Sequence, residues 1–396
     1  MSAPGSVLVV GASAAGLATA EALRRKGFHG SLTLLDADAH PPYDRPPLSK
    51  QYLAGTWDTE RLRLRGDEQL ASLDAAFVRE EPAVALDTGE RRVRTASGRT
   101  YGADAVVIAT GLVPRALPGA AGLAGVHRLR GLDDAAALRS ALAADGPLVV
   151  VGDGVLGAEI AATARGAGCD VTLVGRGPAP LHGRFGPVVA GLLARLHEER
   201  GVRLRFGAGA DLLLGDRGAV SAVALADGRV LPATRVVAAI GSMPATDWLT
   251  GSGLSLADGV VCDSRCRAAE GIWAVGDVAR FHHGGTGLPT RLENRTNATE
   301  QAQCVAADIL GDGRPYTPVP YMWTDQYEAK IQVHGLPSAH DDVDVVEGAV
   351  DERRFVARYR RHGRVTAILG WNMPKQSRLH RAAHTDDLAG TPATVS

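Results

Sequence analysis

The sequence is poor in cysteine, in aromatic residues and in any excess of charge. Its four cysteines form no C-x-x-C pair and no zinc-binding spacing, so a local dithiol redox motif and a zinc knuckle are both excluded. The 43 Lys and Arg residues nearly balance the 44 Asp and Glu residues, which argues against a broad basic face for nucleic acid. No apolar stretch has membrane-spanning length, and the first residues resemble no secretory leader. We therefore expect a soluble, cytoplasmic protein with no nucleic-acid or membrane partner.

Two segments of the chain follow one plan: an aliphatic run, a glycine-rich turn, a helical stretch and a second aliphatic run. Strands and helices are expected at 7–10, 14–26 and 32–35, again at 148–151, 156–168 and 171–174, with further strands at 105–109 and 235–240. Short continuous apolar runs that alternate with helices indicate parallel sheets covered on both faces. The pattern predicts an α/β protein with two Rossmann-type dinucleotide-binding domains.

The pattern changes from about Tyr316. Prolines at 315, 318 and 320 form a linker-like stretch, and apolar and polar residues then alternate at 330–333 and 355–359. Such alternation is typical of an antiparallel sheet with one solvated face. It predicts a smaller C-terminal α+β domain, with a loose polar tail from Thr385.

The first glycine-rich turn is a G-x-S-x-x-G variant of the dinucleotide fingerprint, made of Gly11, Ala12, Ser13, Ala14, Ala15 and Gly16. Its first glycine makes the turn, its small third residue admits the pyrophosphate, and its last glycine lets helix and strand pack closely. The helix N-terminus adds N–H groups and a positive dipole end. Asp36 and Asp38 follow the second strand at the distance expected for ribose-binding acids.

The second turn is an intact G-x-G-x-x-G, made of Gly152, Asp153, Gly154, Val155, Leu156 and Gly157. Its second strand is followed by Gly175 and Arg176, where an NAD site would place an acid. Arg176, with Arg184 as a second partner, would accommodate a 2′-phosphate, although a solvated turn arginine is equally compatible with the pattern. We expect NADPH to be accepted at least as well as NADH.

Five further stretches carry a resemblance to a known family. They are Tyr43–Lys50 (YDRPPLSK), Ile108–Gly111, Ile272–Phe281, Glu293–Ala302 and Trp323–Tyr327. In this order, across nearly the whole chain, they resemble the single-component FAD-dependent NAD(P)H:ferredoxin reductases, the family of putidaredoxin reductase and of the reductases of biphenyl-type Rieske dioxygenases. The resemblance implies a glutathione-reductase-like fold, with a split FAD domain at 1–112 and 240–315, an NAD(P) domain at 113–239 and a C-terminal domain at 316–396. It also implies FAD as cofactor, NADH or NADPH as donor, and a [2Fe-2S] ferredoxin that feeds a cytochrome P450 or a Rieske oxygenase.

The resemblance assigns roles to individual residues. Lys50, one of only four lysines, falls where the family has a lysine beside the flavin, and Glu159 matches its acidic partner. Trp323 matches an aromatic residue at the flavin face and on the electron path. Taken alone, Glu159 reads as a first-turn acid that complements a helix dipole, and only the match at Lys50 favours the functional role. Trp323 taken alone is also compatible with a core residue of the third domain.

The remaining family matches concern cofactor contacts. FAD contacts are expected at Arg45, Ala83, Ala109, Thr110, Gly111, Arg130, Gly276, Asp277, Glu293, Asn294 and Arg295, and NAD(P) contacts at Gly241 and Glu293. Asp277 would accept hydrogen bonds from the FAD ribitol, although a helix N-cap is compatible with the same position. Arg295 departs from the aromatic or aliphatic residue of relatives, and a cation there would raise the flavin potential or alter docking.

A basic rim is expected to steer an acidic ferredoxin, although any single member reads at least as readily as a solvated surface residue of an Arg-rich chain. Its members would be Arg61, Arg63, Arg65, Arg291, Arg295, Lys375, Arg378 and Arg381. Two other functions stay open: a flavin-dependent NAD(P)H oxidase or quinone-type reductase without a protein partner, and a redox-sensing protein that resembles apoptosis-inducing factors.

Overall fold

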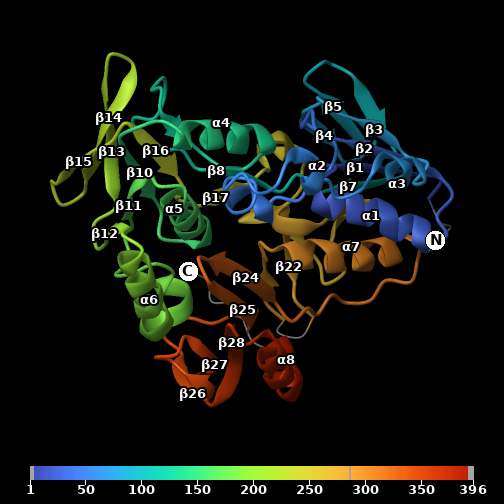
Figure 1. The fold of residues 1–396 in the computed structure, drawn as a ribbon. Coiled ribbons are helices and arrows are strands. Elements are labelled where there is room, and N and C mark those ends of the chain that lie inside the picture. The colour runs from blue at the N-terminus through green and yellow to red at the C-terminus, as the bar shows by residue number, and fades with distance from the viewer. Residues whose placement is uncertain (1–3, 285–286, 391–396) are drawn as a thin grey trace.

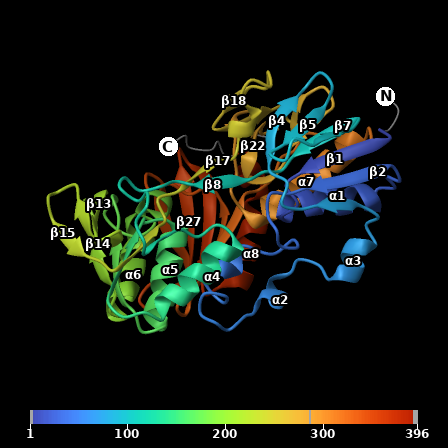
Figure 2. The ribbon, with the colours of Figure 1, turned by 90° about the horizontal axis from the view of Figure 1, so that it is seen from above.

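The computed structural model describes residues 4–284 and 287–390. Three large sheets, two of them mainly parallel and one antiparallel, dominate the fold, and four smaller sheets accompany them (Figures 1 and 2). The first sheet has the order β20 (Arg267–Ala269), β21 (Ile272–Ala274), β7 (Ala105–Ile108), β1 (Ser6–Val10), β2 (Ser31–Leu35) and β3 (Ala76–Val78). Neighbouring strands are parallel except β20 and β21. Helices α1 (Ala14–Arg25) and α7 (Arg295–Ile309), far apart in sequence, lie side by side against it (Figure 1).

The second sheet repeats the plan of the first. Its order is β12 (Arg203–Arg205), β11 (Asp170–Val174), β10 (Pro147–Val151), β16 (Arg235–Ala238) and β9 (Val126–His127), and all of its pairs are parallel. One face packs on α4 (Leu132–Leu142) and α5 (Val155–Gly166). The other face packs on the antiparallel strands β13 (Ala210–Asp216), β14 (Ala219–Leu225) and β15 (Val230–Pro232). The predicted pair of Rossmann-type units is confirmed.

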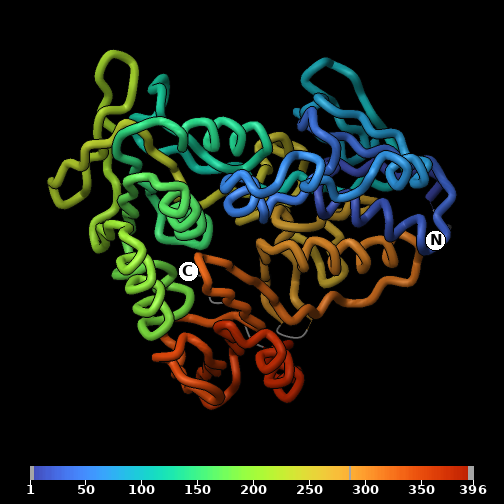
Figure 3. Tube along the Cα trace, in the orientation of Figure 1, coloured from blue at the N-terminus to red at the C-terminus, as the bar shows by residue number. Residues whose placement is uncertain are grey.

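Two short strands connect the halves. After β7 the chain runs through β8 (Leu112–Pro114) into the second sheet and returns through β17 (Ser242–Pro244), which pairs antiparallel with β8. Figure 3 shows the chain path that results, in which the first sheet is completed by strands from both sides of the inserted segment. The exact domain boundaries stay a prediction.

The third sheet has the order β24 (Tyr321–Gln326), β25 (Ala329–Gly335), β28 (Arg364–Trp371), β27 (Arg354–Arg361) and β26 (Asp342–Ala349). All of its pairs are antiparallel, as the alternating pattern predicts. One face packs on α6 (His182–Glu199), which the second Rossmann unit supplies. The helices α8 (Pro374–Ala383) and α9 (Thr385–Ala389) pack against β28 and β25 (Figure 1).

The remaining elements are short. They are η1 (Pro46–Ser49), α2 (Thr59–Leu62), α3 (Asp67–Ala71), β4 (Ala83–Asp87), β5 (Arg92–Thr95), β6 (Thr100–Gly102), η2 (Asp247–Leu249), β18 (Leu256–Ala257), β19 (Gly259–Cys262), η3 (Gly276–Val278), β22 (Ala279–His282) and β23 (Pro289–Thr290). All four cysteines are unpaired thiols. Within residues 4–284 and 287–390, no helix combines the length and the apolar character that a membrane crossing requires.

The expectation of a loose tail from Thr385 is wrong for the residues up to 390. Residues 385–389 form α9, and its Leu388 is only 1% exposed, packed with Val356, Val365 and Ile368. The composition of the tail is polar, but this single leucine anchors the helix on the sheet. Residues 391–396 lie outside the described part of the chain.

We predict that Leu388→Ala lowers the free energy of unfolding by about 2–4 kcal/mol, because a buried leucine loses both its transfer energy and its packing. Leu379→Ala on α8 is the matched control, since Leu379 is 62% exposed, and it should change stability by less than about 0.5 kcal/mol. Urea denaturation of both variants measures the difference. Equal, small effects would contradict the docking of α9.

Candidate functional site

A continuous cleft of about 2210 Å³ lies where the two parallel sheets face the third. Both fingerprint turns line it, at the carboxyl ends of β1 and β10, together with the ends of β7, β11 and β16 and the start of β24. In open parallel sheets, ligands bind at this edge of the strands. One cleft therefore serves both dinucleotide motifs.

The first turn has the backbone geometry that its glycines predict. Gly11 has a φ of 105°, and an added Cβ would collide with the carbonyl of Ala109. A Cβ on Gly16 would collide with the carbonyl of Gly11, so this residue sets the close packing of α1 on β1 and lies behind the cleft wall. Ser13 is the N-cap of α1 without a side-chain capping bond, and Ala14 and Ala15 line the cleft with it.

The second turn repeats this geometry. Gly152 has a φ of 133°, and an added Cβ would collide with the carbonyl of Ala239. A Cβ on Gly157 would collide with the carbonyl of Gly152. Gly154 is the N-cap of α5, and a Cβ there would meet open space, which leaves the approach to the helix N-terminus clear. Val155 and Leu156 line the cleft beside it.

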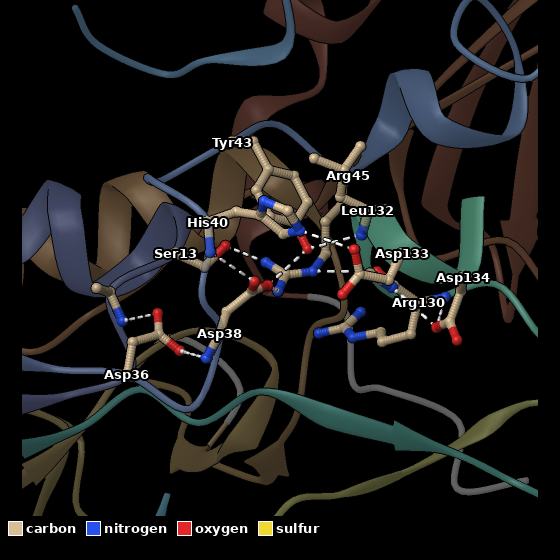
Figure 4. Close-up of polar contacts among 12 residues, drawn as sticks. Ser13, Asp36, Asp38, His40, Tyr43, Arg45, Arg130, Leu132, Asp133 and Asp134 are labelled. Carbon is tan, nitrogen blue, oxygen red and sulfur yellow. Dashed lines mark hydrogen bonds and ion pairs between the residues drawn. The ribbon is translucent and has the colours of Figure 1, made fainter. Parts of the chain in front are cut away.

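Arg45 forms the cationic side of the first turn (Figure 4). Its guanidinium donates to Ser13 Oγ and, at 3.2 Å, to the backbone carbonyl of Arg130, and it lies 5.0 Å from the ring centre of Tyr43. A cation, a free helix N-terminus and a small residue together make a site suited to a pyrophosphate.

The two acids after β2 differ in what they contact (Figure 4). The carboxylate of Asp36 accepts from the backbone N–H of Ala12 at 2.7 Å and of Asp38 at 3.1 Å, so it supports the turn itself. Burial raises the pKa of Asp36, and these two hydrogen bonds offset part of the shift. Asp38 accepts from the Tyr43 hydroxyl at 2.8 Å and lies 3.9 Å from the Arg45 guanidinium. Both acids line the cleft, as predicted for a ribose site.

Asp277 and Arg130 face each other across the cleft, with Nη2 and Oδ2 3.7 Å apart. Burial raises the pKa of the Asp277 carboxyl, and the charge of Arg130 offsets part of this shift. Asp277 lies within η3, whose N-cap is Val275, so the helix-cap alternative for Asp277 is wrong. The preceding Gly276 has a φ of 74° and donates its N–H to Gln301 Oε1 at 2.7 Å, which fixes the loop.

Lys50 and Glu159 form a buried ion pair in the wall of the cleft, with Nζ and Oε2 2.7 Å apart. The side chains are 12% and 5% exposed. Oε2 also accepts from Ser49 Oγ at 2.6 Å, and Oε1 accepts from Thr324 Oγ1 at 2.8 Å. Glu159 lies beyond the first turn of α5. The alternative, in which a first-turn acid complements the helix dipole, therefore does not apply to it. The structure thus brings Lys50 and Glu159 together, as the resemblance implies.

Trp323 lines the cleft on β24, close to the two fingerprint turns. Its ring stacks on Tyr321 at 5.9 Å, and Tyr321 stacks on His334 at 4.8 Å. Trp323 is partly exposed, and its role on the electron path stays a prediction.

Arg176, Arg184 and Gly241 line the cleft on the side of the second turn. Arg176 and Arg184 are exposed, and Arg184 lies 3.5 Å from the sulfur of Met322. Asp153 accepts from the N–H of Gly177 at 2.7 Å and so fixes the loop that carries Arg176.

Five other predicted contacts occupy the loop before α7 and the β7 end. Ala109, Thr110 and Gly111 line the cleft, and Thr110 Oγ1 donates to the carbonyl of Ala245 at 2.9 Å. Glu293 lines the cleft and pairs with Arg291 at 2.5 Å. Asn294 also lines it, but its side chain caps α7 by accepting from the N–H of Asn297.

For two predicted contact residues the structure shows other neighbours, and their roles toward FAD stay predictions. Ala83 packs against the first hydrophobic core, and the described wall of the cleft near it is formed by Ala37, Ala39 and Glu80. Arg295 lines the cleft, but its Nε pairs with Asp44 Oδ1 at 2.9 Å. Its charge is therefore compensated, which weakens the expected effect of a free cation on a flavin potential.

Sequence reasoning missed several polar partners. Tyr43, Asp44, Ser49 and Thr324 hold Asp38, Arg295 and Glu159 in place. All four occur in the stretches that carry the family resemblance, so the signal was present. Spacing alone gives no hint of the contacts of Asp44, Ser49 and Thr324, whose partners lie over a hundred residues away. No group of His, Cys, Asp or Glu suited to a metal ion occurs among the described residues.

Comparisons with known proteins agree with this geometry. Residues 5–302 match the model of the pyridine nucleotide-disulphide oxidoreductases, and residues 321–395 match the reductase C-terminal domain. The chain is 34% identical to rhodocoxin reductase of Rhodococcus erythropolis, covering 98% of this chain and 91% of that protein. It is 34% identical to putidaredoxin reductase CamA of Pseudomonas putida, covering 99% and 94%. The solved covalent complex of putidaredoxin reductase with putidaredoxin superposes with a TM-score of 0.91 at 34% identity, over 98% of this chain and 96% of the reductase chain.

Proposed function

The chain belongs to the pyridine nucleotide-disulphide oxidoreductase family, and we propose that it is an FAD-dependent NAD(P)H:ferredoxin reductase. Its partner would be a [2Fe-2S] ferredoxin that serves a cytochrome P450 or a Rieske oxygenase, as the names of the relatives suggest. The observation that carries the proposal is the cleft that both dinucleotide turns line together with the buried Lys50–Glu159 pair. We also propose that the protein works in the cytoplasm.

The residues of the first turn fit FAD. Gly11 and Ser13 leave room for a pyrophosphate, Arg45 supplies the cation, and Asp38 supplies an acceptor for a ribose. Asp277, half-compensated by Arg130, supplies an acceptor for the hydroxyls of a ribitol chain. When bound, FAD accepts a hydride and releases single electrons, which is chemistry that no side chain of this protein can supply.

The residues of the second turn fit a nicotinamide dinucleotide. The open N-terminus of α5 receives the pyrophosphate, and Arg176 stands where a 2′-phosphate would lie. The two turns face one cleft, so donor and acceptor rings would meet near its centre. Lys50, held by Glu159, places an ammonium at this point, where it stabilises negative charge that develops on the acceptor.

Electrons must leave the protein to an external acceptor. The sequence has no C-x-x-C disulfide and no cysteine set for an iron–sulfur cluster. Trp323 and Pro374, the first residue of α8, line the same small pocket next to the cleft. The basic residues Lys375, Arg378 and Arg381 of α8 therefore stand near the predicted exit and would attract an acidic partner.

Four of the five other members of the predicted rim have acidic partners that compensate their charge, which leaves Arg61 as a lone charge among the described residues. Arg63 pairs with Glu60 and Asp67, Arg65 with Glu21, and Arg291 with Asp258 and Glu293. Arg295 pairs with Asp44, and Arg61 lies over the ring of Trp57. We therefore restrict the proposed docking charge to α8.

The test of the function is steady-state reduction of cytochrome c by the FAD-loaded protein, with NADH or NADPH, with and without a [2Fe-2S] ferredoxin. We expect the rate to depend strongly on ferredoxin. Equal rates without ferredoxin, accompanied by oxygen uptake, would favour an oxidase or a quinone-type reductase. Slow turnover with a change of oligomeric state on addition of NADH would favour a redox sensor.

We predict that Lys50→Met slows single-turnover reduction of the flavin by about 10- to 100-fold while FAD stays bound, because one electrostatic stabiliser is removed. Stopped-flow absorbance measures the rate. Lys26→Met is the matched control, since Lys26 is exposed beyond the end of α1. An unchanged rate in Lys50→Met would remove this residue from the mechanism.

We predict that Trp323→Ala impairs reduction of ferredoxin several-fold more than reduction of ferricyanide, because the small acceptor does not need the exit on β24. Trp323→Phe keeps an aromatic ring and should retain most of the ferredoxin rate. Steady-state assays with both acceptors measure the ratio. Equal losses with both acceptors would place Trp323 among residues that only support the fold.

We predict that Arg176→Ala raises the KM for NADPH by about 10-fold and leaves the KM for NADH within about 2-fold, because only the former carries a 2′-phosphate. Initial-rate kinetics with ferricyanide measure both constants. The same change for both cofactors, or no change, would show that Arg176 is a solvated turn residue.

A further inference from the structure

The Lys50–Glu159 pair continues into a chain of hydrogen bonds that crosses the interface with the third sheet. Glu159 Oε1 lies 2.8 Å from Thr324 Oγ1, and Gln326 Nε2 lies 3.2 Å from the same hydroxyl. Gln326 Oε1 then lies 2.9 Å from His197 Nε2 on α6. The side chains of Thr324, Gln326 and His197 are 0%, 1% and 0% exposed, so water does not share these bonds.

Chemistry fixes the direction of every bond in this chain. A carboxylate only accepts, so the Thr324 hydroxyl donates its single proton to Glu159. The lone pair that remains on this oxygen must receive an N–H, which is the amide nitrogen of Gln326. The amide oxygen of Gln326 must then accept, so His197 donates from Nε2.

His197 suits this role because it stays neutral. Burial lowers its pKa from the ordinary value, and the hydrogen bond to Gln326 offsets only part of the shift. Nδ1 has no partner among the described residues, which agrees with a neutral ring protonated at Nε2. The edge of Tyr327 contacts the ring, with centroids 5.4 Å apart, and limits its rotation.

We propose that His197, Gln326 and Thr324 are positioning residues that hold Glu159, and through it Lys50, at the catalytic centre. The proposal rests on the proposed function, since it assumes that the Lys50–Glu159 pair, which these hydrogen bonds hold, takes part in hydride transfer. The chain joins three parts of the protein: Lys50 follows η1, Glu159 and His197 belong to the second Rossmann unit, and β24 supplies the other two residues. The Lys50 ammonium is therefore held in position only when the third sheet packs correctly against the second Rossmann unit.

The sharpest variant is Thr324→Val, which keeps the shape of the side chain and removes the hydroxyl. Glu159 then loses one of its donors, and Gln326 loses its acceptor. We expect the first-order rate of flavin reduction at saturating NADH to fall about 3- to 10-fold, with FAD content and the Kd of NADH unchanged. Thr324→Ser restores the hydroxyl and should restore the rate to within about 2-fold.

A second readout needs neither FAD nor turnover. Thermal unfolding of the apoprotein is measured for Thr324→Val, for Glu159→Gln and for the double variant. We expect the Tm loss of the double variant to be smaller than the sum of the two single losses, because both changes break the same bond.

Gln326→Met, which removes the next link, should reproduce the rate loss of Thr324→Val to within about 2-fold.

The proposal is overturned if Thr324→Val lowers Tm without a change in the rate, if Thr324→Ser fails to restore the rate, or if the Tm losses add. None of these measurements uses ferredoxin, so they test the positioning role independently of the proposed electron acceptor. A protein that fails the ferredoxin test but shows the coupled losses keeps the positioning chain and loses only the proposed acceptor.

Discussion

The buried ion pair between Lys50 and Glu159 sets the strictest demand on the assembly of the site, because three parts of the chain must meet to complete it. Removing two charges from water costs several kcal/mol per ion, and an ion pair offsets this cost only when further hydrogen bonds complete it. Here Ser49 and Thr324 supply those bonds, and each comes from a different part of the chain. The pair is therefore stable only when the η1 loop, α5 and β24 are all in place. A protein that needed only a stable core would have an apolar contact at this position at lower cost, so the pair points to chemistry in the cleft.

The rest of the site shows how repeated local geometry is adapted to two different ligands. Gly11 and Gly152 meet the carbonyls of Ala109 and Ala239 in the same way, so both turns open the N-terminus of a helix toward the cleft. The surrounding charges then differ. The first turn is enclosed by Arg45 with Asp38 close by, whereas the second has an exposed arginine and an open approach. A tightly held cofactor fits the first environment, and an exchanging one fits the second.

The sequence predicts the parts of this protein that depend on local pattern. The two parallel units follow from aliphatic runs and glycine turns, and the antiparallel sheet follows from alternation at 330–333 and 355–359. The prediction of a loose tail was wrong because the burial of one leucine, Leu388, against the third sheet is enough to hold a polar segment as a helix. The partner of Arg295 could not be predicted either, since Asp44 lies 251 residues away in sequence. Lys50 and Glu159 were paired only through the family resemblance, because no rule of spacing joins a loop lysine to a helix 109 residues later.

The central claim is that the ion pair faces the site of hydride transfer, and a crystal structure of the FAD-loaded protein tests it most directly. The account predicts the isoalloxazine ring at the centre of the cleft, with Lys50 Nζ at contact distance, about 3–4 Å, from the ring and still paired with Glu159. A ring more than about 8 Å from Lys50, beyond direct contact, would contradict the account. The pair would then serve only to join the three parts of the protein.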